Sequence, residues 1–105
     1  MNKEVRKVLL KLGITSNLQG YHYIIEAFKI IQKQKIHTNI TTIYAMVGKK
    51  LDNTPTGVER GIRHALQKSW KTETLKKIYT KMPDNSVFLY DLYFNFDIMK
   101  DEIKK

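Results

Sequence analysis

The side chains best suited to recognise a ligand gather in one short stretch, positions 56 to 67. The chain has only three arginines against sixteen lysines, and two of the three, Arg60 and Arg63, lie in this stretch. An arginine guanidinium can donate two parallel hydrogen bonds to the edge of a guanine, whereas a lysine is a point charge suited to phosphate. The placement of the arginines therefore favours contact with the bases of DNA.

The spacing of these residues puts them on one side of a helix over about 55–69, at roughly 100° per residue. Its inner side would carry Val58, Ile62, Ala65, Leu66 and Ser69. Its outer side would carry polar and basic residues, namely Thr56, Arg60, Arg63 and Gln67, flanked by Glu59 and His64. The alternative to DNA contact is a solvated helix face with an i,i+4 ion pair between Glu59 and Arg63.

The overall charge also points to a polyanion. The chain of 105 residues has a formal net charge of +9, and its last segment, residues 84–105, carries five acidic and three basic side chains. The positive field therefore belongs to residues 1–83. Such a field suits DNA, RNA or an anionic lipid surface, and the alternative is a lysine-rich surface that is simply solvated.

Several other classes of protein are excluded or disfavoured. The chain has no cysteine, so disulfides, zinc-finger sites and thiol catalysis are excluded. No apolar run approaches the ~20 residues of a transmembrane helix, and the charged N-terminus is not a secretory signal. His22, His37 and His64 lack metal-ligand spacing, and no catalytic motif is present. We expect a cytoplasmic protein that is no enzyme, needs no metal or cofactor and has no membrane partner.

The apolar periodicity predicts an all-α domain over 1–105, with six helices joined by short links. The third helix has an N-cap at Asn39 and runs to Leu51; the fourth begins with a Thr54 cap followed by Pro55. The others are predicted over about 2–12, from 18 to before Ile36-His37, from a Thr72 cap to Met82-Pro83, and from Asp84 or Asn85 through Ile103.

The third and fourth helices are separated by about three residues, Asp52 to Thr54. This is the layout of a helix-turn-helix, whose second helix lies in the DNA major groove; an ordinary αα-hairpin is the alternative. Two glycines interrupt the fourth helix at a cost of up to about 1 kcal/mol each. Gly57 would allow close approach to the DNA backbone, and Gly61 would allow close packing of a neighbouring helix.

The sequence resembles the C-terminal DNA-binding domain of the sporulation initiation response regulators, the stage zero sporulation protein A family. Residues 58–65 read V-E-R-G-I-R-H-A where the family has V-E-R-A-I-R-H-A, and residues 20–27 match its G-Y-x-Y-x-x-E-A segment. The similarity covers about residues 8–100. Further matches are Leu12-Gly13-Ile14, Ala45 to Leu51 with Lys49-Lys50, Trp70 and Asn85-Ser86.

This resemblance implies a six-helix transcription regulator that binds double-stranded DNA boxes of the TGTCGAA type, often as tandem dimers, and that contacts partners such as RNA polymerase. Base contacts would come from Glu59, Arg60 and Arg63. Backbone or supporting contacts would come from Lys49, Lys50, Thr54, Thr56, Gly57, His64 and Gln67.

Three departures from the family pattern bear on function. Gly57 stands where the family usually has an arginine that contacts guanine, so one bidentate contact is missing. The connection at Thr80 to Asp84 is several residues shorter, which changes surfaces toward a partner subunit or polymerase. No receiver domain precedes the effector domain, so we expect either a stand-alone protein or a piece of a longer regulator.

Two alternatives to a sequence-specific regulator remain open. One is an interaction protein without a receiver domain, which would antagonise a full-length regulator by occupying its DNA boxes or by pairing with it through the sixth helix. The aromatic residues Tyr90, Tyr93 and Phe94, which lie partly off the core stripe, would then form an exposed patch rather than a wider core face. The other is a non-specific nucleic-acid binder or a basic protein that lies on a membrane surface.

Overall fold

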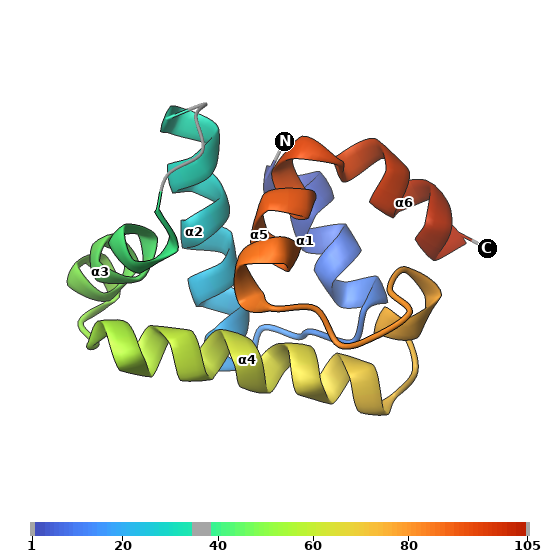
Figure 1. The fold of residues 1–105 in the computed structure, drawn as a ribbon, viewed down its shortest axis with the longest axis horizontal. Helices are drawn as coiled ribbons and strands as arrows, with labels where there is room; N and C mark the ends of the chain where they lie inside the picture. The colour runs from blue at the N-terminus through green and yellow to red at the C-terminus, as the bar shows by residue number, and fades with distance from the viewer. Residues whose placement is uncertain (1, 35–38, 105) are drawn as a thin grey trace.

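Amphipathic helices account for the whole architecture. The computed structural model describes residues 2–34 and 39–104, which form six α-helices and one 3₁₀ turn (Figure 1) and contain no strand. The predicted all-α, six-helix class is confirmed. The predicted fifth helix is only a 3₁₀ turn, however, and the predicted sixth helix is two helices, α5 and α6. The elements are α1 (Asn2–Lys11), α2 (Gln19–Gln34), α3 (Ile40–Leu51), α4 (Pro55–Lys71), η1 (Leu75–Lys77), α5 (Asn85–Phe94) and α6 (Phe96–Lys104). The predicted boundary at Ile36-His37 lies outside the described residues.

The predicted fifth helix is wrong. Thr72 does not begin a helix but ends α4, and its hydroxyl donates to the carbonyl oxygen of Ser69 at 3.0 Å. Glu73 then adopts a left-handed conformation with φ 68°, which reverses the chain and leaves a single 3₁₀ turn at η1. The following loop is held by Tyr79, whose hydroxyl donates to Asp91 Oδ2 at 2.7 Å. Burial and this carboxylate raise the pKa of Tyr79.

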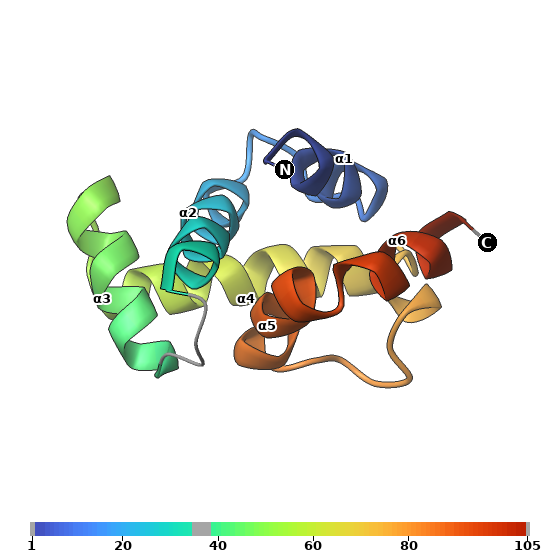
Figure 2. The same cartoon turned by 90° about the horizontal axis from the view of Figure 1, so that it is seen from above.

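The predicted sixth helix is two helices. Asn95 ends α5, where its amide nitrogen Nδ2 donates to Asp91 Oδ1 at 2.8 Å, and its carbonyl oxygen accepts from the Met99 N–H at 3.0 Å to start α6. The break turns α6 back toward α1, as Figure 2 shows from above. Met99 and Ile103 are buried as a result. The apolar spacing alone did not reveal the break because it is nearly continuous across Asn95.

The core is organised around α2, which contacts α1, α3, α4 and α5. Ile24, Ala27 and Ile31 of α2 are 0% exposed, and Phe28 is 1% exposed. The five residues predicted to line the inner side of α4 are likewise 0% exposed: Val58, Ile62, Ala65, Leu66 and Ser69. Burial of these side chains fixes the rotation of α4 about its axis, and hence which of its residues face outward.

Two glycines let α2 and α4 cross at backbone contact. A Cβ atom on Gly20 would lie 2.3 Å from the Gly61 carbonyl oxygen and 2.7 Å from Ala65 Cβ. A Cβ atom on Gly61 would lie 2.6 Å from Tyr23 Cε2. The predicted role of Gly61 in close helix packing is confirmed. The crossing leaves no room for a side chain on Gly20, because the obstructing atoms belong to the backbone and to a fully buried alanine.

We predict that Gly20→Ala lowers the free energy of unfolding by about 1–3 kcal/mol, because α2 and α4 must separate to admit the methyl group. Lys33→Ala is the control, because it changes an exposed side chain on the same helix α2. Urea unfolding followed by circular dichroism measures both. Equal midpoints for the two variants would contradict a tight crossing at Gly20.

Candidate nucleic-acid interface

The turn between α3 and α4 is built from local hydrogen bonds. Asp52 is left-handed with φ 60°, and the Asn53 N–H donates to the Gly48 carbonyl oxygen at 2.8 Å. The Gly57 N–H donates to the Thr54 hydroxyl at 3.0 Å, and Pro55 follows as the first helical residue. The N-caps predicted at Thr54 and at Asn39, whose Oδ1 accepts from the Thr41 N–H at 2.8 Å, are confirmed. The angle between the two helices is therefore set by short-range contacts.

A tyrosine of α2 ties this turn to the core. The Asn53 Nδ2 donates to the Tyr23 hydroxyl at 2.6 Å, and that hydroxyl donates to Gln19 Oε1 at 3.3 Å. The Tyr23 side chain is 5% exposed, and its ring lies against Gly61. Tyr23 therefore contacts both the turn and the middle of α4, and these contacts fix the position of the turn relative to the helix. Sequence patterns gave Tyr23 no such role.

The outer face of α4 is open to solvent. In Figure 1 this helix runs along the lower edge of the molecule, with the other helices above it. Its 17 residues span about 26 Å. The side chains predicted for this face are all exposed: Thr56, Arg60, Arg63, His64 and Gln67. The predicted flanking residue Glu59 is only partly exposed, because it lies closer to α5.

The two arginines of α4 are in different surroundings. Arg60 is exposed and makes no ion pair with a described residue. Arg63 forms an ion pair with Glu59, so the i,i+4 pair that was the alternative interpretation of this face is present. The side chain of Arg63 is nevertheless 55% exposed, against 24% for Glu59. Its guanidinium therefore remains accessible while Glu59 restrains its direction.

Asn85, at the start of α5, also supports this region, and it was not identified from the sequence as a structural contact. Its Nδ2 donates to the Glu59 carbonyl oxygen at 2.9 Å and to the Tyr44 hydroxyl at 3.1 Å. One buried amide thus joins the start of α5 to both helices of the helix-turn-helix. Burial raises the pKa of Tyr44, although the hydrogen bond from Asn85 opposes the shift.

The end of α3 supplies two exposed lysines next to the turn. Lys49 makes no ion pair with a described residue. Lys50 Nζ lies 2.9 Å from Glu26 Oε1, and Lys29 Nζ lies 3.2 Å from Glu26 Oε2. Burial raises the pKa of Glu26, but the hydrogen bonds and charges of the two lysines outweigh it and leave the pKa below its ordinary value. Lys50 is thus already paired, though its side chain is 65% exposed.

The described residues form neither a metal site nor a membrane-spanning helix. No three His, Asp or Glu side chains in the ranges 2–34 and 39–104 come close enough to hold a metal ion. His22 Nε2 is hydrogen-bonded to the Ser16 carbonyl oxygen at 2.8 Å, and His37 lies outside the described part of the chain. No helix in that part is long and apolar enough to cross a membrane.

Helices α3 and α4 meet at a tight turn, and the outer face of α4 is exposed and basic; this is the arrangement of a helix-turn-helix. A family model described as "Sporulation initiation factor Spo0A C terminal" matches residues 5–92 of this 105-residue chain. The chain therefore belongs to the family of C-terminal, DNA-binding effector domains of the sporulation initiation factor, which is not an enzyme family. The predicted family is confirmed.

The Tyr23 hydroxyl generates a prediction about the turn. Tyr23→Phe removes the acceptor of Asn53 and should lower the free energy of unfolding by about 0.5–1.5 kcal/mol. It should also speed hydrogen exchange of the Thr54 and Gly57 amides, because the turn loses its tie to α2. Tyr93→Phe is the control, since the Tyr93 hydroxyl makes no hydrogen bond to a described residue. Unchanged exchange in Tyr23→Phe would mean that the turn holds its shape alone.

The ion pairs of Glu26 predict a pH dependence. Because the pKa of Glu26 is lowered on folding, its charge stabilises the fold above the ordinary carboxyl pKa of about 4.5, and this is lost as the pH falls through the folded-state pKa. Glu26→Gln should cost about 1–2 kcal/mol at pH 7 and progressively less below pH ~4. Thermal unfolding at both pH values measures the difference. Glu73→Gln, which breaks the exposed pair with Lys76, is the control and should change little. If the stability difference between Glu26→Gln and the unmodified protein were the same at both pH values, the ion pairs of Glu26 would not contribute as proposed.

Proposed function

We propose that this protein is a sequence-specific DNA-binding transcription regulator that places α4 in the major groove, as one domain over residues 1–105. The observation that carries the proposal is that two of three arginines project from the solvent-exposed face of a helix held rigidly by a helix-turn-helix. Base-edge contacts require such rigid presentation, because one bidentate contact distinguishes bases only if its donors are correctly oriented.

In this proposal Arg60, Arg63 and Glu59 contact bases. Arg60 has no competing carboxylate, so its guanidinium can enter the groove directly. Arg63 is restrained by its ion pair with Glu59, which lowers the entropy lost when its guanidinium binds. The pair also offsets the repulsion that an isolated Glu59 carboxylate would meet near phosphate.

Most of the affinity would come from contacts with phosphate, and these carry no sequence information. Lys49 and Lys50 at the end of α3 and Thr54 and Thr56 at the start of α4 lie on both sides of the turn, where a DNA backbone would cross it. Exposed polar residues further along α4, His64 and Gln67, would extend this contact along the groove.

Gly57 should change the sequence preference relative to the family. The position that carries an arginine in the family pattern has no side chain here, and the neighbouring amide of Asn53 occupies the space beside it. A missing bidentate contact removes about 1–3 kcal/mol of discrimination at one base pair. We therefore propose that the preferred box is a variant of TGTCGAA that is relaxed at one position.

Fluorescence anisotropy with a TGTCGAA-type duplex and a scrambled duplex, each at two salt concentrations, tests the proposal. We expect the specific duplex to bind more tightly at both. Arg63→Ala should lose about 1–3 kcal/mol on the specific duplex and much less on the scrambled one. Lys49→Ala, the comparison, should weaken both duplexes alike and make the affinity less dependent on salt.

The outcomes separate the alternatives. Equal, salt-sensitive binding of both duplexes by the unmodified protein would indicate a non-specific nucleic-acid binder. Equal losses on both duplexes for Arg63→Ala would show that Arg63 contacts only the backbone. Absence of binding to either duplex would shift the proposal to a protein-interaction role.

One observation favours such a second role. Phe94 and Ile98, at the junction of α5 and α6, are 49% and 63% exposed, an unusual exposure for large apolar side chains. We propose that this surface contributes to pairing of two copies on tandem boxes, or to contact with a full-length regulator or RNA polymerase. Sedimentation with and without DNA, using the Ile98→Ser variant, tests pairing. If both the unmodified protein and Ile98→Ser bound a two-box duplex as single copies, pairing through this surface would be contradicted.

A further inference from the structure

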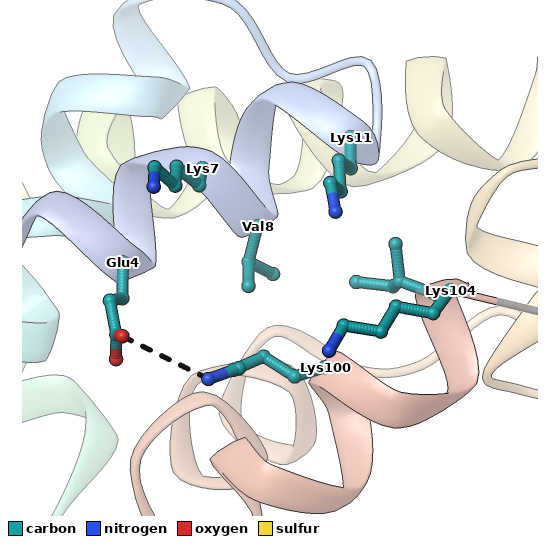
Figure 3. A pocket seen from close by; sticks show the side chains of 7 residues that line it. Glu4, Lys7, Val8, Lys11, Lys100 and Lys104 are labelled. Atoms are coloured by element: carbon teal, nitrogen blue, oxygen red, sulfur yellow. Dashed lines mark ion pairs between the residues drawn. The ribbon is translucent and has the colours of Figure 1, made fainter.

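A second concentration of positive charge lies away from α4. The helices α1 and α6 enclose a hollow of about 180 Å³ (Figure 3). Its base is apolar, formed by Val8 and Ile103, which are 3% and 8% exposed. Its rim carries four lysines, two from each helix, and one carboxylate: Lys7, Lys11, Lys100, Lys104 and Glu4. We call this the lysine groove.

The described residues do not balance the charge of the lysine groove. Among them, only Lys100 has a carboxylate partner, Glu4 Oε1, at 3.9 Å, and this pair is exposed and long. Lys7, Lys11 and Lys104 form no ion pair with a described residue. Figure 3 shows the ammonium groups of Lys11 and Lys104 directed toward the same space from opposite helices. Such convergence is unfavourable without a counter-ion, so the groove is suited to an anion.

The lysine groove is separate from the surface that would contact DNA. In Figure 1, α1 and α6 both lie above α4, and the outer face of α4 points the opposite way. None of the residues lining the groove belongs to α3, α4 or their turn. A duplex lying along α4 therefore leaves the groove open to a different ligand.

We propose that the lysine groove binds the phosphate chain of a small polyphosphate or organic triphosphate. Four ammonium groups without an arginine suit phosphate, because lysine binds it as a point charge, whereas bidentate recognition of carboxylates favours arginine. At about 180 Å³ the hollow is smaller than the roughly 300–1,000 Å³ of pockets that hold drug-sized ligands, so it suits a phosphate chain with the rest of an organic ligand outside it. The uncharged part of such a ligand would lie against the stems of the lysines at the rim.

Calorimetric titration with tripolyphosphate and with adenosine triphosphate, in physiological salt, tests this site. We expect saturable binding and backbone amide NMR shifts confined to α1 and α6. The double variant Lys11→Gln, Lys104→Gln should weaken binding about tenfold or more, equivalent to 1.4 kcal/mol or more. The control, Lys77→Gln with Lys81→Gln, removes the same charge from exposed lysines outside the groove and should change affinity less than about twofold.

Binding of both ligands would assign the groove to nucleoside triphosphates as well as polyphosphate, and binding of tripolyphosphate alone would assign it to condensed phosphate. Equal weakening of binding in the two double variants would overturn the proposal, because binding would then depend on the overall charge of the protein and not on the groove. Equally tight binding of tetraglutamate would overturn the preference for phosphate. If only the groove variant lost binding to duplex DNA, the ligand of the groove would be DNA and not a small phosphate compound. If only the groove variant lost binding to phosphatidylglycerol vesicles, the ligand would be a membrane surface. Unchanged duplex binding keeps this test independent of the function proposed for α4.

Discussion

The structure depends on the close crossing of α2 and α4 at Gly20 and Gly61. Backbone contact at this point brings α4 onto the most buried helix of the domain, where the inner side chains of α4 are fully enclosed. The depth and rotation of α4 are then fixed, so its outer residues cannot turn inward. A face intended for another molecule needs this kind of support, because each base contact tolerates little positional error.

Contacts around the crossing extend this rigidity to the turn. Tyr23 lies against Gly61 and accepts a hydrogen bond from Asn53, so α2 contacts the turn and the middle of α4 at once. Asn85 does the equivalent from α5, through Glu59 and Tyr44. Glu26 joins α2 to the end of α3 through Lys50. Two polar links from α2 and one from α5 therefore hold the helix-turn-helix.

Two surfaces of different geometry carry positive charge. Two of the three arginines lie on α4, which faces outward along an open edge, whereas four lysines line the space between α1 and α6. The difference in residue type matches a difference in geometry. A planar guanidinium can address the edge of a base, and several flexible ammonium groups can surround a phosphate chain. The two proposed anion contacts thus rest on different cationic side chains in different surroundings.

The sequence by itself determined the features that depend on neighbouring residues. Helical periodicity, the caps at Asn39 and Thr54, the tight turn and the outward face of α4 all follow from interactions within a few positions. The residues over 58–65 and 20–27 together indicated the family. Tertiary structure decided the rest. Thr72 ends a helix because Glu73 reverses the chain toward Leu75, and the helix after Asp84 breaks at Asn95 so that Met99 and Ile103 reach the core. The roles of Tyr23 and Asn85 and the lysine groove join residues distant in sequence, and no local pattern records such contacts because they form only when the helices pack.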